Sequence, residues 1–305
     1  MGDYALLVGN GINNLTDGNS WSDVLQSLSQ KYSIAIDTQN KPFPLAYEEI
    51  YFTILKTRHS ERTENSIKSF IAEKIKTITG NAIHQQLMAL SCRNIMTTNY
   101  DLTLESCLPD AAEIKNNGII KEQKYSIFRH HQIDDKLIWH IHGAINVPQS
   151  ITLGYEHYSG YLQAMRNYTA TGSSYSKAEF NDLKPLIRRL STAENEFSWI
   201  DNFFRRNVYI VGLTLDFVEI DLWWLLTWRE RCRLLKSNNV SINNQIVYYL
   251  PACFADDKAT VAKIALLESV GVTVRKAFGQ HFRRSKEDEQ HYYAAVIGDI
   301  RKAEE

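Results

Sequence analysis

The chain has 305 residues, of which 44% are hydrophobic and 23% charged, with a formal net charge of −1 at pH 7. This length suits one large α/β domain or two small ones, and the near-neutral charge gives no support to binding of nucleic acid or of an anionic membrane. No segment approaches the roughly 18 consecutive apolar residues of a membrane span, and no secretory signal is visible, so we expect a cytoplasmic protein.

The first 90 residues predict one buried strand followed by helices. Tyr4–Val8 is a short apolar run that ends at a glycine, as expected of a parallel strand. Residues 12–20 are rich in Asn, Asp, Gly and Ser, which predicts a loop, and Ser20 has the residue type of a helix N-cap. Helical spacing follows over 21–32 and again over 43–90, where its length indicates a helical insertion.

The rest of the chain alternates strands with helices. Strands are predicted at 95–98, 137–141, 207–211, 245–250 and 272–274, and helices at 102–108, 161–204, 217–235 and 259–270. The stretch between 108 and 131 shows no regular pattern. This alternation predicts an α/β fold, a Rossmann-like doubly wound parallel sheet. We expect a single domain over residues 1–305, with helical insertions at about 43–90 and 161–204.

No metal site is expected from the sequence. The four cysteines stand apart, at Cys92, Cys107, Cys232 and Cys253. A zinc ribbon needs two close cysteine pairs, because one turn must place two thiolates about 2.3 Å from the same metal. His157, taken with His140 and His142, has a spacing that fits no standard metal site, and its one obvious acidic neighbour is Glu156.

A glycine turn follows the first predicted strand. Gly9 and Gly11 stand where glycine lets backbone N–H groups approach a pyrophosphate, and a helix start nearby would add its dipole. The dinucleotide pattern GxGxxG is incomplete, because Asn14 takes the place of its third glycine. On the glycines alone, a simple strand-to-helix turn explains the pattern equally well.

Polar residues follow the second predicted strand, at the edge where open α/β sheets place their ligands. Asn99 offers a donor and an acceptor to a ribose hydroxyl, and Asp101 can accept from a carboxamide NH₂, which would select nicotinamide. The alternative is local: Asn99 bonds its own turn, and Asp101 caps a helix that starts at Leu102. For Asp101 both interpretations can hold.

His142 ends the strand predicted at 137–141 and precedes Gly143. An imidazole with an unperturbed pKa of roughly 6.5 exchanges a proton near neutral pH, so His142 is a candidate for proton transfer. A lone histidine at a strand end is more often structural, but its place after the segment with Asn99 favours function. We expect His140 on the opposite face of the strand, as part of the scaffold.

A later glycine, Gly212, follows the strand predicted at 207–211, and Thr214 and Asp216 come directly after it. Thr214 can bond a phosphate or the adenine ribose, whereas Asp216 is as readily the N-cap of the next helix. An aromatic stripe on that helix is more often core than interface. The stripe consists of Trp223, Trp224 and Trp228.

Four short segments in this order resemble the SIR2-like family, the group that contains the sirtuins. They are Gly9-Asn10-Gly11-Ile12-Asn13, Thr98-Asn99-Tyr100-Asp101, His142-Gly143 and Val211-Gly212-Leu213-Thr214-Leu215. The resemblance spans the chain from Leu6 to about Leu226. It is closer to bacterial SIR2-like proteins of anti-phage defence, because residues 153–158 add to it and the four-cysteine zinc module of sirtuin deacylases is absent.

The resemblance implies an NAD+ hydrolase that cleaves the nicotinamide–ribose bond to nicotinamide and ADP-ribose, with NAD+ as its substrate and no metal. Its catalytic residues would be Asn99, Asp101 and His142. The residues that hold NAD+ would be Gly9, Asn10, Gly11, Ile12, Asn13, Thr98, Gly212 and Thr214. Cyclisation of NAD+ in place of hydrolysis stays open.

The resemblance also implies regulation, because an unrestrained hydrolase would drain the NAD+ of its own cell. We expect a gated effector of bacterial anti-phage defence that acts by NAD+ depletion. It would work as a homo-oligomer or with a sensor protein, such as an ATPase or a nucleotide-recognising partner, and without a membrane or direct nucleic-acid contact. The alternatives are an NAD-dependent protein deacylase and a non-catalytic sensor that binds NAD+ or ADP-ribose.

Overall fold

The structure is a computed structural model that describes most of the chain. The described residues are 4–16, 21–37, 40–57, 63–108, 114–118, 124–172, 183–191, 196–236, 240–282 and 284–303. The predicted N-cap Ser20 lies outside them.

The centre of the molecule is one eight-stranded sheet in the order β3-β4-β5-β2-β1-β6-β7-β8. The strands from β5 to β8 in that order are all parallel, and β4 and β3 extend one edge in antiparallel pairing. Along the parallel part, the order in the chain is third, second, first, fourth, fifth, sixth, which is the strand order of doubly wound dinucleotide-binding sheets. The predicted α/β, Rossmann-like fold is confirmed.

The strands lie close to where the sequence predicts them. They are β1 Tyr4–Val8, β2 Asn94–Thr97, β3 Lys115–Asn117, β4 His130–Ile133, β5 Lys136–His140, β6 Asn207–Val211, β7 Ile246–Tyr249 and β8 Val272–Arg275. The sequence does not reveal β3 and β4. Both are short and polar and pair at the edge of the sheet, so neither carries the continuous apolar run of a buried strand.

The longer helices of the described residues are α1 Trp21–Lys31, α2 Phe43–Lys56, α3 Glu64–Ile75, α5 Tyr155–Arg166, α8 Ile220–Leu234, α9 Lys258–Ser269 and α10 Lys286–Lys302. Shorter ones are α4 Ala82–Met88, α6 Leu186–Arg189, α7 Asn202–Arg205 and the 3₁₀ helices η1 Asn10–Leu15 and η2 Glu105–Cys107. The predicted loop at 12–20 is therefore wrong over its first part. There the buried side chains of Ile12 and Leu15 anchor η1 to the core.

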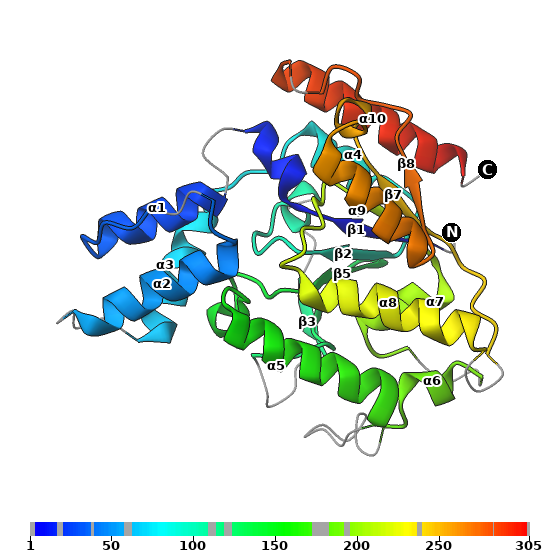
Figure 1. Cartoon of the computed structure of the whole chain (residues 1–305), viewed down its shortest axis with the longest axis horizontal. Helices are drawn as coiled ribbons and strands as arrows, with labels where there is room; N and C mark the ends of the chain where they lie inside the picture. The colour runs from blue at the N-terminus through cyan, green and yellow to red at the C-terminus, as the bar shows by residue number, and fades with distance from the viewer. Residues whose placement is uncertain are drawn as a thin grey trace.

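Helices cover both faces of the sheet (Figure 1). One face packs through residues such as Leu7 and Met96 against α5, α7, α8 and α9. The other packs through Leu6 and Ile95 against α4 and α10. Because the central strands are buried on both faces, a ligand can reach them only near the strand ends, and open α/β sheets bind their ligands at the carboxyl ends.

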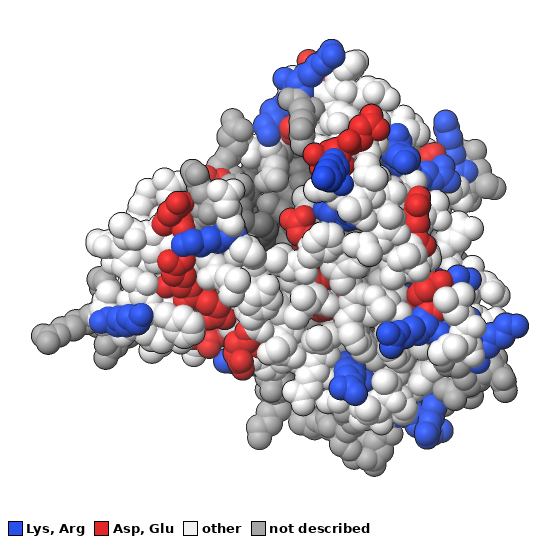
Figure 2. Space-filling model, viewed as in Figure 1, with Lys and Arg blue, Asp and Glu red and all other residues white. Residues whose placement is uncertain are grey.

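Helices α1, α2 and α3 pack together in a separate helical lobe beside the sheet, at the left of Figure 1. Its apolar cluster includes Ile50 and Ile71 and reaches the sheet domain through Tyr100 and Leu153. Figure 2 shows acidic side chains gathered over this lobe, whereas Lys, Arg, Asp and Glu are interspersed elsewhere on the face shown. Among the described residues, no helix is long and apolar enough to cross a membrane.

Candidate functional site at the carboxyl edge of the sheet

The two glycine turns found in the sequence meet at the carboxyl edge of the sheet. Strands β1 and β6 are parallel neighbours at the position where the strand order reverses, which is where open α/β sheets bind ligands. The N–H of Gly9 donates to the carbonyl of Val211 at 2.9 Å, and the N–H of Gly11 donates to the carbonyl of Gly212 at 2.7 Å. The turns after β1 and β6 therefore form one joined rim.

Glycine is required at this rim because the two turns approach closely. A Cβ on Gly9 would lie 2.5 Å from the Cα of Leu213, and a Cβ on Gly11 would lie 2.7 Å from the carbonyl oxygen of Gly212. Both N–H groups are already used between the turns. In this structure, therefore, neither N–H group points to a ligand, although Gly11 itself lines the cleft at the rim.

The cleft at the rim consists of two adjoining cavities, one of about 380 Å³ and one of about 300 Å³. The residues common to both are Gly11, Asn14, Gly212, Leu213, Thr214 and Asp216. Together the cavities fall within the ordinary size of small-molecule and cofactor sites. The two cavities differ in the side chains that line them. The larger is lined by ionisable groups, among them His142 and Glu219, whereas the smaller is lined mainly by aromatic rings.

His142 lines the larger cavity and is held by helix α8. Its Nε2 lies 2.8 Å from Oδ2 of Asp221, a buried carboxylate in the first turn of α8. This contact assigns a proton to Nε2 and leaves Nδ1 as the atom that can accept one. Burial by itself lowers the pKa of His142, but the charge of Asp221 and its hydrogen bond outweigh burial and raise that pKa above its ordinary value.

A second carboxyl group, Glu219, lines the same cavity just before α8. Its Oε2 is buried and has no hydrogen-bond partner among the described residues. Burial raises the pKa of Glu219 to about 8, with His142 opposing the rise and Asp221 reinforcing it. Glu219 therefore carries a proton at neutral pH and holds an unused oxygen beside His142.

Two tyrosines complete the polar cavity. Tyr100 and Tyr158 line it, and the ring of Tyr158 packs edge-on to the imidazole of His142, with ring centroids 5.4 Å apart. The hydroxyl of Tyr100 donates to the carbonyl of Thr152. Burial raises the pKa of both phenols, so both stay neutral. This wall offers an uncharged surface to a flat ring.

The smaller cavity lies between β7 and α10 and is mainly aromatic. Its wall includes the rings of Tyr248, Phe282, Tyr292 and Tyr293. Two lysines also line it. Lys263 donates to the carbonyl of Thr214 at 2.9 Å, and Lys286 donates to the carbonyl of Asn14. A flat apolar group with an anionic group next to it fits this combination.

Asn13 and Asp101 bond each other behind the cleft. The Nδ2 of Asn13 donates to Oδ2 of Asp101 at 2.8 Å, and the Oδ1 of Asn13 lies 3.0 Å from Nε2 of His84. The other oxygen of Asp101 accepts from the N–H of Thr103 at 3.0 Å. Both oxygens of Asp101 thus accept hydrogen bonds within the protein, and the bond from Thr103 is the local capping interaction.

Asn99 and His140 support the ends of β2 and β5. The Nδ2 of Asn99 donates to the carbonyl of Gly9 at 3.4 Å, and the Nδ1 of His140 donates to the carbonyl of Asn99 at 2.8 Å. His140 bonds Glu105, whereas His142 bonds Asp221 of α8, so the two imidazoles turn to different parts of the protein. Strand alternation does not explain this, because it would put residues two apart on the same face. The imidazoles diverge because β5 ends at His140.

Residues 93–191 match the model of the SIR2-like domain. The match includes β2, β5 and the cleft residues Thr98 and His142. It supports the SIR2-like family for this chain and points to an activity that involves NAD. No curated protein matches the chain.

The structure divides the residues that the SIR2-like resemblance singled out. Those that line the cleft are Asn10, Gly11, Thr98, His142, Gly212 and Thr214. Those that stand behind it are Gly9, Ile12, Asn13, Asn99 and Asp101, of which Ile12 is fully buried in the core. The second group shapes the rim through packing and hydrogen bonds, while the first is in position to touch a ligand.

Sequence reasoning missed the partners of His142. Two carboxylic residues interrupt the apolar stretch at the start of α8, Glu219 just before the helix and Asp221 in its first turn. An acidic residue in an otherwise apolar stretch is the one feature of the sequence that points to them. Buried carboxyl groups are uncommon unless they are paired. Their relation to His142 was not visible, because 79 positions separate His142 from Asp221 in the chain.

One further cluster within the SIR2-like match has the residue types of a metal site. The possible ligand atoms of Glu105, His131 and His140 all lie within 4.8 Å of one another. Oε1 of Glu105 lies 2.6 Å from Nδ1 of His131 and 2.7 Å from Nε2 of His140. The remaining ring nitrogens bond Asn146 and the carbonyl of Asn99. Every ring nitrogen is thus engaged by hydrogen bonds, which fits a buried ion pair better than a metal.

We therefore expect the protein to need no metal. Dialysis against a chelator should leave both its melting temperature and its turnover of NAD+ unchanged, since the ring nitrogens of His131 and His140 are engaged by hydrogen bonds and the cysteines are isolated. Elemental analysis of the purified protein gives the check. One zinc per chain, with a fall in melting temperature on its removal, would contradict this expectation.

Proposed function

We propose that this chain is an NAD+ hydrolase that cleaves the bond between nicotinamide and ribose. The observation that carries the proposal is the buried His142–Asp221 pair with Glu219 beside it, in a cleft at the switch point of a dinucleotide-binding sheet. The SIR2-like match over residues 93–191 supports it, because it includes Thr98 and His142 of the cleft and links them with NAD.

The two halves of the cleft suit the two halves of NAD+. The aromatic cavity between β7 and α10 fits the adenine ring, and Lys263 and Lys286 bring positive charge toward the phosphates. The residues shared by both cavities, among them Gly212 and Thr214, fit the middle of the dinucleotide. This placement puts the nicotinamide riboside against His142.

Cleavage of the nicotinamide–ribose bond requires a negative charge near the ribose and one base that accepts a proton from water. Hydrolysis of this bond resembles glycoside hydrolysis and passes through a ribosyl cation. Nicotinamide leaves as a neutral base from a cationic ring, so it needs no proton. The cationic ring favours the ionised form of Glu219, and that carboxylate then offsets the positive charge that moves to the ribose.

Water completes the reaction. Its oxygen forms a bond to the anomeric carbon as the carbon–nitrogen bond breaks, and the bonding electron pair stays with nicotinamide. The proton of the water passes to Nδ1 of His142, and Asp221 stabilises the resulting imidazolium. Asn13, Asn99 and Asp101 contribute by holding the rim in shape, and Thr98 contacts the ribose.

The direct test is to incubate the purified chain with NAD+ and follow its products by chromatography, alone and with the products of neighbouring genes. Nicotinamide and ADP-ribose should appear in equal amounts. A cyclic product would show that an internal nucleophile of NAD+ replaces water. NAD+ that binds and is recovered intact under all these conditions would exclude hydrolysis and leave a sensor.

We further propose that assembly gates this activity, as suits a defence effector that acts by NAD+ depletion. Helix α2 presents exposed apolar side chains at Leu45, Phe52 and Leu55, with exposed fractions of 48%, 53% and 38%. Their spacing puts them on one stripe of the helix. Phe43, at the start of the same helix, lines the cleft. A contact on α2 is therefore placed to affect the cleft directly.

The expected result is that the isolated chain turns over NAD+ weakly and that assembly raises its rate. Phe52→Glu should reduce both assembly and turnover, because it puts a charge into the apolar stripe. Val261→Glu, a matched change at an exposed position of α9, should reduce neither. Light scattering and NAD+ turnover measured on the same samples provide the check. A monomer that hydrolyses NAD+ at the full rate would rule out gating by assembly.

A further inference from the structure

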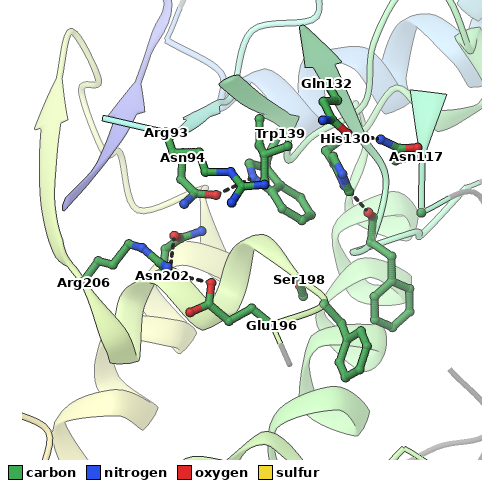
Figure 3. Close-up of a pocket in the computed structure, with 14 residues that line it drawn as sticks. Arg93, Asn94, Asn117, His130, Gln132, Trp139, Glu196, Ser198, Asn202 and Arg206 are labelled. Atoms are coloured by element: carbon green, nitrogen blue, oxygen red, sulfur yellow. Dashed lines mark hydrogen bonds and ion pairs between the residues drawn. The ribbon is translucent and has the colours of Figure 1, made fainter. Parts of the chain in front are cut away.

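A second cavity, of about 430 Å³, opens at the amino-terminal ends of β2 and β5 (Figure 3). Its walls come from the starts of these two strands, from β3 and β4, and from residues 196–206. The cleft lies at the other ends of β2 and β5. Strands of four or five residues separate the two sites by roughly 13–16 Å, so the cavity shares no lining residue with the cleft.

One wall of this cavity holds unused hydrogen-bond donors. Asn94 is 4% exposed, and its Oδ1 accepts from Nε1 of Trp139 at 3.3 Å. Its Nδ2 has no partner in the described part of the chain and faces the cavity in Figure 3. The exposed guanidinium of Arg93, on the same side, makes no ion pair with any described residue. A buried amide N–H₂ and a free guanidinium side by side favour an anionic oxygen.

The opposite wall of the cavity carries a further positive charge, which also favours an anionic ligand. Arg206 lies across the cavity from Asn94 in Figure 3 and pairs with Glu196 at 2.6 Å, while Asn202 accepts from it at 3.3 Å. Among the described residues that line the cavity, two guanidinium groups therefore accompany one carboxylate, that of Glu196. The charge of these described lining residues is therefore positive on balance, which favours an anionic group of a ligand.

The remaining walls suit a flat ring. His130 and Trp139 pack with ring centroids 4.2 Å apart, and the half-buried ring of Phe197 also lines the cavity. Beyond them, Nδ2 of Asn117 donates to Oε1 of Gln132 at 3.0 Å, which leaves each amide with further capacity to bond the polar edge of a base. An inorganic anion would use only the first wall, and none of the aromatic and amide surface.

We propose that this cavity is a second ligand site, for a nucleoside monophosphate. The phosphate binds Arg93 and Asn94, the base lies against the rings of His130 and Phe197, and its edge meets the amides of Asn117 and Gln132. The cavity of about 430 Å³ lies within the range of small-molecule sites and is smaller than the two cavities of the cleft together, so we expect a ligand smaller than the NAD+ of the cleft.

Binding to the whole chain can be measured by calorimetry with 5′-AMP, 5′-UMP and inorganic phosphate as probes. At least one mononucleotide should bind more tightly than phosphate. Arg93→Glu, an exposed substitution that reverses the charge at the phosphate, should weaken this binding at least tenfold. Lys115→Glu, a matched charge reversal at an exposed residue of β3 outside the cavity, should change it little.

Because AMP can also enter the cleft, the Arg93→Glu comparison assigns the site. Mononucleotide binding that Arg93→Glu leaves unchanged would place the ligand elsewhere and overturn the proposal. Equal binding of phosphate and mononucleotides would reduce the cavity to an anion site and overturn it as well, as would the absence of binding at millimolar concentrations. None of these readouts depends on NAD+ turnover, so the proposed hydrolase and this site can fail separately.

Discussion

Replacing His142 by alanine is expected to abolish NAD+ cleavage while the protein remains folded. In the proposed reaction, Nδ1 of His142 accepts the proton of the attacking water, and Asp221 holds the imidazole in the required tautomer. Loss of one positioned acid–base group lowers a rate by roughly 10²–10⁴-fold. Nicotinamide release under saturating NAD+ gives the rate, and circular dichroism with a melting curve reports the fold.

Two further variants test the role of His142, one at its partner Asp221 and one at a control histidine. Asp221→Asn keeps the size of the side chain but weakens its hold on His142, so it should lower the rate on the order of 10²-fold with little change in NAD+ binding. His291→Ala removes an exposed histidine of α10 and should leave turnover unchanged. A folded His142→Ala protein with near-normal turnover would remove His142 from the mechanism.

Replacing Glu219 by glutamine is expected to cost about as much and to change the pH dependence of the rate. Burial raises the pKa of Glu219 to about 8, far above the ordinary carboxyl value, so the free protein holds this group protonated at neutral pH. The carboxylate is the form that offsets the ribosyl cation. The value of kcat/KM should therefore rise as the pH approaches about 8 and then level off.

The rise of kcat/KM toward pH 8 should be absent from the Glu219→Gln protein. Groups facing Glu219 also titrate or carry charge, namely His142, Asp221, Asp216 and Lys263, so the assignment depends on comparing variants. Glu268→Gln, which removes an exposed carboxyl of α9, should keep the profile of the unchanged protein. A Glu219→Gln protein with the same rate and the same rise of kcat/KM with pH would show that this carboxyl has no part in catalysis.

The sequence by itself determined the fold class and most of the strands. Buried parallel strands are continuous apolar runs, such as Tyr4–Val8 and Asn207–Val211, and glycines mark where two of them end. These are local properties of the chain. Local patterns also mark where the strands end, and the residues at those ends include His142 and Thr98, which line the cleft.

Only the tertiary structure decided which of these residues line the cleft. Gly9, Asn13 and Asp101 share the motifs of the cleft residues, yet their polar groups are used within the protein. Asn99 uses its Nδ2 in the same way, while its buried Oδ1 has no hydrogen-bond partner among the described residues. A motif gives residue types, whereas hydrogen-bond partners come from distant segments.

The same reason explains what no local pattern could show. Asp221 meets His142 because α8 packs on the sheet beside the end of β5, and the cavity at Arg93 forms from segments between 93 and 206. The pKa of Glu219 depends on burial and on neighbouring charges, which exist once the chain has folded. Secondary structure follows from local periodicity, but the chemistry of a site follows from long-range packing, and only the folded chain sets that packing.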